Sequence, residues 1–134
     1  GSPPYESTQS QKDYQYRSPL TWLPRAKSLA IDINAGIRDG HEGSVPISHS
    51  LMAFNRLVPE SDQIQETDIL ELTGKGQVSA ALSNSSLTDS LYGEKQPLFR
   101  KVSGKIRVTI FDGGHEGILN AELSWLAQQV KQQP

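Results

Sequence analysis

The sequence contains no cysteine at any of its 134 positions. Without thiols, the chain cannot form a disulfide, a zinc–thiolate site or a cysteine nucleophile. A chain without cysteine is compatible with both a reducing and an oxidising compartment. The sequence therefore leaves the choice between a cytoplasmic and a secreted protein open.

The chain also lacks an excess of charge of one sign and any long apolar run. Its 13 basic and 15 acidic side chains give a formal net charge of −2, and they form no block of like charge. This balance favours neither nucleic acid nor an anionic membrane as a partner. No apolar stretch reaches the length that a bilayer span requires, so we expect a soluble protein.

The length of the chain allows one domain with a small hydrophobic core. Gly1 and Ser2 look like the scar of a removed tag. The residues that follow, up to position 15, are polar and rich in Pro, Ser, Gln and Tyr. We therefore expect a flexible linker over residues 1–15 and the domain over residues 16–134.

The apolar pattern of the domain predicts alternating strands and helices. Residues 29–35 and 106–111 are short apolar stretches, typical of buried strands. Residues 59–104 carry little periodicity and are expected to be an irregular insertion, in which Ile69, Leu70 and Leu72 could form a short strand or helix. A helix is predicted after each strand from apolar residues spaced three or four apart: Ile47, Leu51, Phe54 and Val58 in the first, and Leu119, Leu123, Leu126 and Val130, beside Trp125, in the second. This order of elements indicates an α/β fold.

Two short loops of similar composition follow the two predicted strands. Residues 39–43 read Asp-Gly-His-Glu-Gly, and residues 112–117 read Asp-Gly-Gly-His-Glu-Gly. In an α/β sheet, ligands and catalytic groups lie at the carboxyl ends of the strands. Each loop offers carboxylates and an imidazole there, so one loop could supply an acid and the other a base.

Residues 32–50 and 108–116, taken together, resemble the last third of an α/β-hydrolase of the prolyl-oligopeptidase type, a family of serine peptidases and esterases. The first segment contains the acid loop and a Val-Pro entry into a helix, and the second contains the Gly-Gly-His loop. The resemblance extends over about residues 16–131. It implies the C-terminal portion of an α/β-hydrolase fold, namely the last two core strands with their following helices and an excursion between them.

The resemblance also implies roles for individual residues. His115 is similar to the general base of the family, and Asp39 is similar to the acid that orients it. Glu42 is the alternative acid, because it stands three residues before Val45. His41 is expected to support its own loop by hydrogen bonding, and Gly113 and Gly114 to let the base loop turn sharply. No cofactor is implied.

The nucleophile of such a triad is missing from the chain. It belongs in a Gly-x-Ser-x-Gly elbow upstream of the acid, and no such elbow occurs in this sequence. In the parent protein the substrate is expected to be a peptide or an ester. A segment with two predicted strands also lacks neighbours for its sheet edges, so we expect it to need a complementary N-terminal segment or to self-associate. The chain alone is not expected to catalyse acyl transfer.

Two hypotheses from other classes stay open. Carboxylate and imidazole ligands from both loops could hold a divalent metal ion, although no His-Glu-x-x-His spacing is present; the ligands would be Asp39, His41, Glu42, His115 and Glu116. Alternatively, the chain is a binding or assembly module that uses the same fold without chemistry.

Overall fold

The computed structural model describes residues 8–80, 82–83 and 87–129 and has a mixed α/β architecture. Within these residues, no helix combines the length and the apolar character needed to cross a membrane. The α-helices are α1 (Thr8–Arg17), α2 (Pro19–Trp22), α3 (Ser48–Leu57), α4 (Glu66–Lys75) and α5 (Leu119–Ala127), with 3₁₀ turns η2 (Leu23–Ala26), η3 (Glu60–Asp62) and η4 (Ser90–Tyr92). The strands are β1 (Ile31–Gly36), β2 (Pro97–Ser103) and β3 (Ile106–Phe111).

The three strands form one sheet in the order β1-β3-β2. β1 and β3 are parallel, and β2 forms an antiparallel hairpin with β3. The strand predicted over residues 106–111 is confirmed as β3, and the one predicted over residues 29–35 is confirmed with a shift of one or two residues at its ends. Since β3 lies in the middle, β1 is an edge strand of the described sheet.

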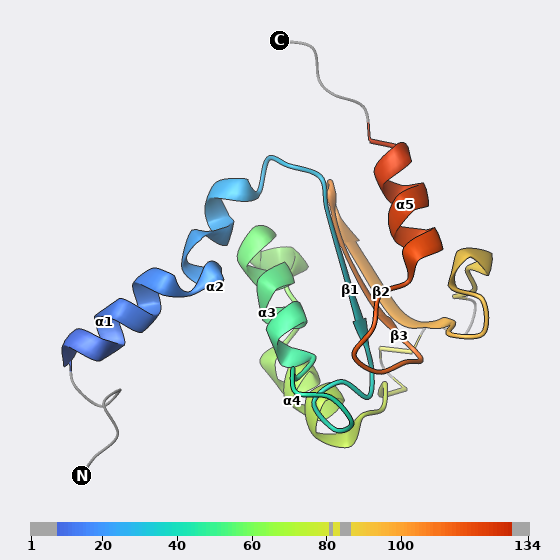
Figure 1. The fold of residues 1–134 in the computed structure, drawn as a ribbon, viewed down its shortest axis with the longest axis horizontal. Helices are drawn as coiled ribbons and strands as arrows, with labels where there is room; N and C mark the ends of the chain where they lie inside the picture. Colours follow the sequence, from blue (N-terminus) through green and yellow to red (C-terminus); the bar gives the residue numbers. More distant parts are fainter. Residues whose placement is uncertain (1–7, 81, 84–86, 130–134) are drawn as a thin grey trace.

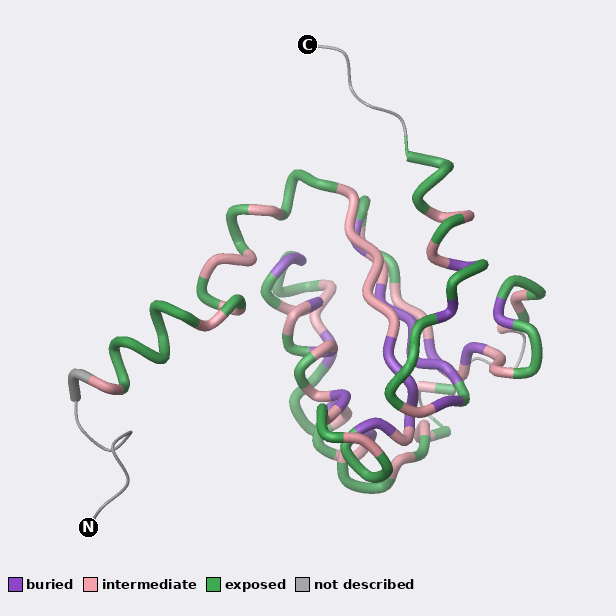
Figure 2. The backbone as a smooth tube through the Cα atoms, viewed as in Figure 1, coloured by how far each residue is buried: buried purple, intermediate pink, exposed green. Residues whose placement is uncertain are grey.

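Helices cover the two faces of the sheet unequally. α3 and α4 lie on one face and α5 lies on the other (Figure 1). The main core fills the space under α3 and α4, and the buried residues along the strands are visible in Figure 2. All four predicted core positions of the first helix are buried, which confirms its orientation: Ile47, Leu51, Phe54 and Val58.

The stretch predicted as an irregular insertion, residues 59–104, contains two regular elements: α4, for which the sequence leaves a short strand or helix open, and β2, which the pattern does not predict. α4 begins with acidic residues in its first turn and ends at Lys75, before Gly76 with a φ of 60°; both are ordinary helix-end signals. β2 is an edge strand that starts with a proline and carries Arg100 and Lys101. Edge strands often contain such residues, which weaken the alternation by which strands are recognised.

The prediction that α5 buries its leucines is also wrong. Leu119, Leu123 and Leu126 are 65%, 55% and 62% exposed, whereas Ala121 is buried. Val130 lies outside the described residues. The sheet face beneath α5 carries a bidentate ion pair between Arg107 and Asp32, with distances of 2.7 and 2.8 Å. The Arg107 guanidinium lies 6.0 Å from the centroid of the Trp125 ring, so α5 meets this ion pair with an indole. Ala121 instead packs in a small apolar cluster with Tyr92, Phe111 and Ile118.

The linker expected over residues 1–15 is helical from Thr8 onward, where α1 begins. Residues 1–7 lie outside the described part of the chain. α1 projects away from the sheet (Figure 1), and residues 10–17 are exposed or half-exposed. The polar composition of this segment therefore predicts its lack of core contacts but not its local conformation.

The unequal burial of the two helical faces predicts different costs for two leucine truncations. Leu51→Ala should lower the free energy of unfolding by about 3 kcal/mol, because Leu51 is fully buried and its removal leaves a cavity. Leu123→Ala should change it by less than about 0.5 kcal/mol, because Leu123 is mostly exposed. Urea denaturation of both variants measures these values. Equal costs would show that α5 packs on its leucine face.

Candidate functional site

The parallel pairing of β1 and β3 brings the two loops to the same edge of the sheet. The strands are in register up to the pair Gly36 and Phe111. The backbone pairing then continues into the loops, since Ile37 N donates to Phe111 O at 2.9 Å and Arg38 N donates to Gly113 O at 3.0 Å. Backbone hydrogen bonds therefore hold the acid loop (residues 39–43) and the base loop (residues 112–117) side by side, independently of their side chains.

Asp39 and His115 form a direct hydrogen bond at this edge. His115 Nδ1 lies 2.7 Å from Asp39 Oδ2. The other carboxylate oxygen, Oδ1, accepts from the backbone amides of Gly40 at 3.0 Å and Val45 at 3.3 Å. Because an ionised carboxylate can only accept, Nδ1 is the protonated nitrogen of the ring.

The surroundings of Asp39 favour its ionised form. Burial raises the pKa of this carboxyl group, but the hydrogen bond from His115 and those from the amides of Val45 and Gly40 outweigh burial. The pKa of Asp39 therefore lies below its ordinary value of 3.8. The carboxylate stays charged near neutral pH and is available to stabilise an imidazolium at His115.

The imidazole of His115 reaches solvent while its partner does not. The side chain of His115 is 63% exposed and that of Asp39 is 10% exposed. Within the described residues, His115 Nε2 makes no hydrogen bond, so its lone pair is free to accept a proton when the ring is neutral. The pair has the geometry of a general base with an orienting acid.

A hollow of about 360 Å³ lies beside this pair. Three of its lining residues belong to β1 and none to β3, which places the hollow against the edge strand. α3 contributes one wall and the base loop another. Its lining residues are Asn34, Ala35, Gly36, Asp39, Val45, Ser50, His115, Glu116 and Gly117.

Glu42 and His41 point to other partners. Glu42 Oε2 lies 3.4 Å from Arg38 Nε, and its side chain is 66% exposed, so the alternative acid does not reach His115. His41 Nε2 lies 2.7 Å from the backbone oxygen of Thr73 near the end of α4. Among the described residues, no three His, Asp or Glu side chains are placed to share a metal ion. The geometry therefore does not support the five-residue metal site.

The two glycines of the base loop, Gly113 and Gly114, differ in how much room a side chain would have. Neither Gly113 nor Gly114 has a positive φ, so neither position requires glycine for its backbone angle. A Cβ at Gly113 would lie 2.3 Å from the Phe111 ring, whereas one at Gly114 would meet nothing closer than 3.8 Å. Gly113 is required by contact, and Gly114 has room for a side chain.

Two glycines outside the predicted set control the approach of the loops. A Cβ at Gly36 would lie 2.3 Å from Gly114 O, because the base loop crosses directly over this residue. A Cβ at Gly43 would lie 2.5 Å from Asp39 Oδ1 and 2.9 Å from His115 Cβ. The sequence signals their importance only weakly, since both are part of ordinary strand-end and loop glycine patterns.

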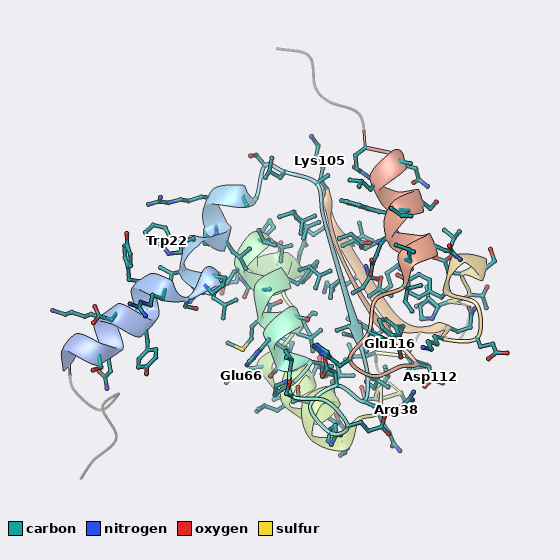
Figure 3. The ribbon with its side chains drawn as sticks, in the orientation of Figure 1. Trp22, Arg38, Glu66, Lys105, Asp112 and Glu116 are labelled. Carbon is teal, nitrogen blue, oxygen red and sulfur yellow. The ribbon has the colours of Figure 1, made fainter. Side chains whose placement is uncertain are left out.

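Charged side chains surround the two loops. Arg38 pairs with Asp112 across the loops, and Lys95 pairs with Glu116. Figure 3 shows Arg38, Asp112 and Glu116 together at one end of the sheet, with Lys105 at the opposite end. These ion pairs connect the acid loop, the base loop and the turn before β2.

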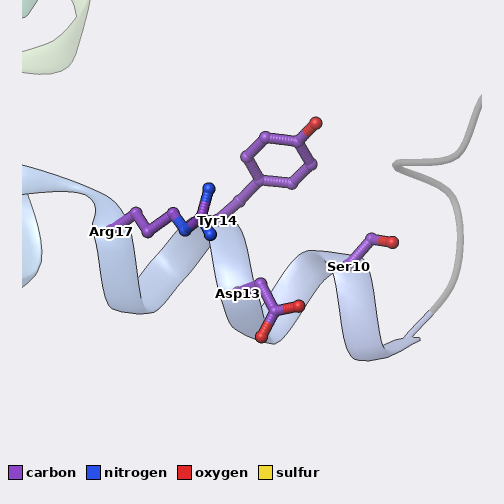
Figure 4. Close-up of a pocket in the computed structure, with 4 residues that line it drawn as sticks. All are labelled: Ser10, Asp13, Tyr14 and Arg17. Atoms are coloured by element: carbon purple, nitrogen blue, oxygen red, sulfur yellow. The ribbon is translucent and has the colours of Figure 1, made fainter.

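A separate hollow of about 190 Å³ lies on α1. It is lined by Ser10, Asp13, Tyr14 and Arg17, which occupy one side of a single helix (Figure 4). A groove with a wall from only one element cannot enclose a ligand, and α1 projects away from the sheet edge where His115 lies (Figure 1). We therefore place the candidate site at the paired loops.

No family model matches the chain, and neither a curated protein nor a solved structure is detectably similar to it. The geometry of the two loops therefore has to carry any assignment of function.

Substitution of Gly43 should break the pair without unfolding the chain. In Gly43→Ala, the new methyl group would force Asp39 and His115 apart. The low-field proton NMR signal of His115 Nδ1–H should disappear or move upfield. Gly74→Ala is the matched control, because a Cβ there meets nothing within 4 Å; it should leave the signal unchanged. An unaltered signal in Gly43→Ala would mean that the loops are not in contact at this point.

The lowered pKa of Asp39 predicts a pH-dependent contribution to stability. The ionised carboxylate is favoured in the folded chain, so its contribution is present above the ordinary pKa of 3.8 and is lost as the pH falls through the lower folded pKa. The free energy of unfolding should therefore fall more steeply in the wild type than in Asp39→Asn below about pH 4. Denaturation curves between neutral and strongly acid pH measure both slopes. Parallel slopes would contradict a lowered pKa.

Proposed function

We propose that this chain is the C-terminal part of a serine hydrolase with an α/β-hydrolase fold, and that it supplies the acid and the base of a Ser-Asp-His triad. The observation that carries the proposal is the 2.7 Å hydrogen bond between His115 Nδ1 and Asp39 Oδ2 at the carboxyl ends of two parallel strands. The mixed α/β architecture and the order of acid before base along the chain agree with it. Hydrolysis of an ester or peptide bond is the corresponding reaction.

The roles of the two residues follow from their hydrogen bonds. Nε2 of His115 would take the proton from a serine hydroxyl while the serine oxygen forms a bond to the substrate carbonyl carbon. Asp39 would hold the ring and stabilise its positive charge. The imidazolium would then give its proton to the leaving alcohol or amine as the scissile bond breaks, and a water molecule would release the acyl group by the same proton transfers.

The nucleophile would come from outside this chain. β1 is an edge strand, and unpaired strand edges accept a further strand readily. A strand that paired with this edge would end beside the hollow that His115 and Asp39 line. We propose that a complementary N-terminal segment occupies the edge and brings the serine, with a second copy of the chain as the other possible occupant.

Activity measurements in the longer protein test these roles. With the upstream segment present, His115→Ala and Asp39→Asn should each reduce the turnover of an activated ester by about 10³-fold or more, as expected when one member of a triad is lost. His49→Ala is the control, because this exposed histidine on α3 lies outside the pair. It should retain full activity.

Full activity in either His115→Ala or Asp39→Asn would overturn the assignment. A fluorophosphonate probe should leave the chain unlabelled when the upstream segment is absent. Stoichiometric labelling of a serine under those conditions would show that the nucleophile lies within residues 1–134.

A further inference from the structure

Glu116, the residue after His115, makes two hydrogen bonds to Gly114, the residue before His115. Its backbone amide donates to Gly114 O at 3.0 Å, which closes a tight turn centred on His115. Its side-chain oxygen Oε1 accepts from the backbone amide of Gly114 at 3.1 Å. One residue therefore bonds to both polar backbone groups of the residue that precedes His115.

Lys95 holds the second oxygen of the same carboxylate. Lys95 Nζ pairs with Glu116 Oε2. Lys95 itself lies in the turn that follows η4, where its amide donates to Tyr92 O at 3.0 Å. Tyr92 is buried. The turn before β2 thus supplies a cation to Glu116 Oε2, so both oxygens of Glu116 are occupied.

A second contact fixes this turn to the base loop. Asp112 N donates to Gln96 O at 3.0 Å, one residue beyond Lys95. The ion pair and the backbone bond lie at the two ends of the base loop. The pKa of Glu116 is lowered, chiefly by the hydrogen bond from Lys95 and then by the bond from Gly114, so the carboxylate is ionised and keeps both contacts near neutral pH.

His115 depends on such support because its own ring is weakly held. The side chain is 63% exposed. Within the described residues, the ring makes one hydrogen bond, from Nδ1 to Asp39. Backbone movement at Gly114 or His115 would swing the ring away from Asp39. The two hydrogen bonds between Glu116 and Gly114 restrain the backbone against that movement.

We propose that Glu116 is a positioning residue for His115, and that Lys95 locks it in place from the hairpin. This inference rests on the proposed function, in which His115 is the base. It assigns a task to a carboxylate and a lysine that do not belong to the triad. The turn before β2 accordingly forms part of the support of the site rather than an incidental connection.

The test measures how fast the Nδ1 proton of His115 exchanges with water in the full chain, by saturation transfer on its low-field NMR signal. Glu116→Ala removes both side-chain contacts and should raise the exchange rate about fivefold, the ratio that corresponds to one hydrogen bond. Glu116→Gln keeps an acceptor for Gly114, and Lys95→Met removes only the ion pair. Each should raise the rate about twofold.

Glu94→Gln is the matched control, since this exposed carboxylate in the same turn makes no hydrogen bond or ion pair within the described part of the chain. It should leave the exchange rate unchanged. Wild-type exchange rates in folded Glu116→Ala, Glu116→Gln and Lys95→Met would overturn the inference and leave the proposed function intact. If Glu116→Ala fails to fold, the other two variants decide between these outcomes.

Failure of the proposed function gives a different result. In that case the low-field signal is absent from the wild type, or it persists unchanged in Asp39→Asn. Faster exchange in Glu116→Ala and Lys95→Met, with no change in Glu94→Gln, supports the positioning role. It would show that the exchange rate responds to the contacts of Glu116 and not to the loss of any carboxylate near this turn.

Discussion

The site depends on the close parallel packing of β1 and β3 where both strands end. Gly36 pairs with Phe111, and the base loop then crosses Gly36 so closely that a methyl group there would overlap Gly114 O. Backbone bonds from Ile37 and Arg38 carry the pairing into the loops. Asp39 and His115, 76 residues apart in sequence, meet because their strands end at the same level. A one-residue change in register would separate them.

The two faces of the sheet differ in polarity. The face beneath α3 and α4 is apolar and provides the main core. The face beneath α5 contains the bidentate Asp32–Arg107 pair and the hydrogen bond from the Tyr92 hydroxyl to Asn34. Tyr92 also anchors the turn that holds Lys95. The polar face thereby links the edge strand to the support of His115, while Leu119, Leu123 and Leu126 of α5 stay largely exposed.

The sequence allows prediction of those parts that depend on local pattern. The apolar run at 106–111 and the spacing of Ile47, Leu51 and Phe54 predict β3 and α3, and the family resemblance of the two loops suggests Asp39 as the acid with Glu42 as the alternative. β2 is not predictable in this way because its charges and proline follow from its place at an edge. The burial of α5 depends on which face of the sheet is polar, and the need for Gly36 and Gly43 depends on distances between loops. Both depend on tertiary contacts between distant segments, which the local sequence pattern does not reveal.

The central claim is that Asp39 fixes the tautomer of His115 and leaves Nε2 free to accept a proton. The most direct test is the pair of ring ¹⁵N chemical shifts of His115, measured at a pH where the ring is neutral. We expect a protonated Nδ1 and an unprotonated Nε2 in the wild type, with a shift toward the mixture of tautomers of a free imidazole in Asp39→Asn. A wild-type ring protonated at Nε2, or a tautomer that Asp39→Asn leaves unchanged, would contradict the account.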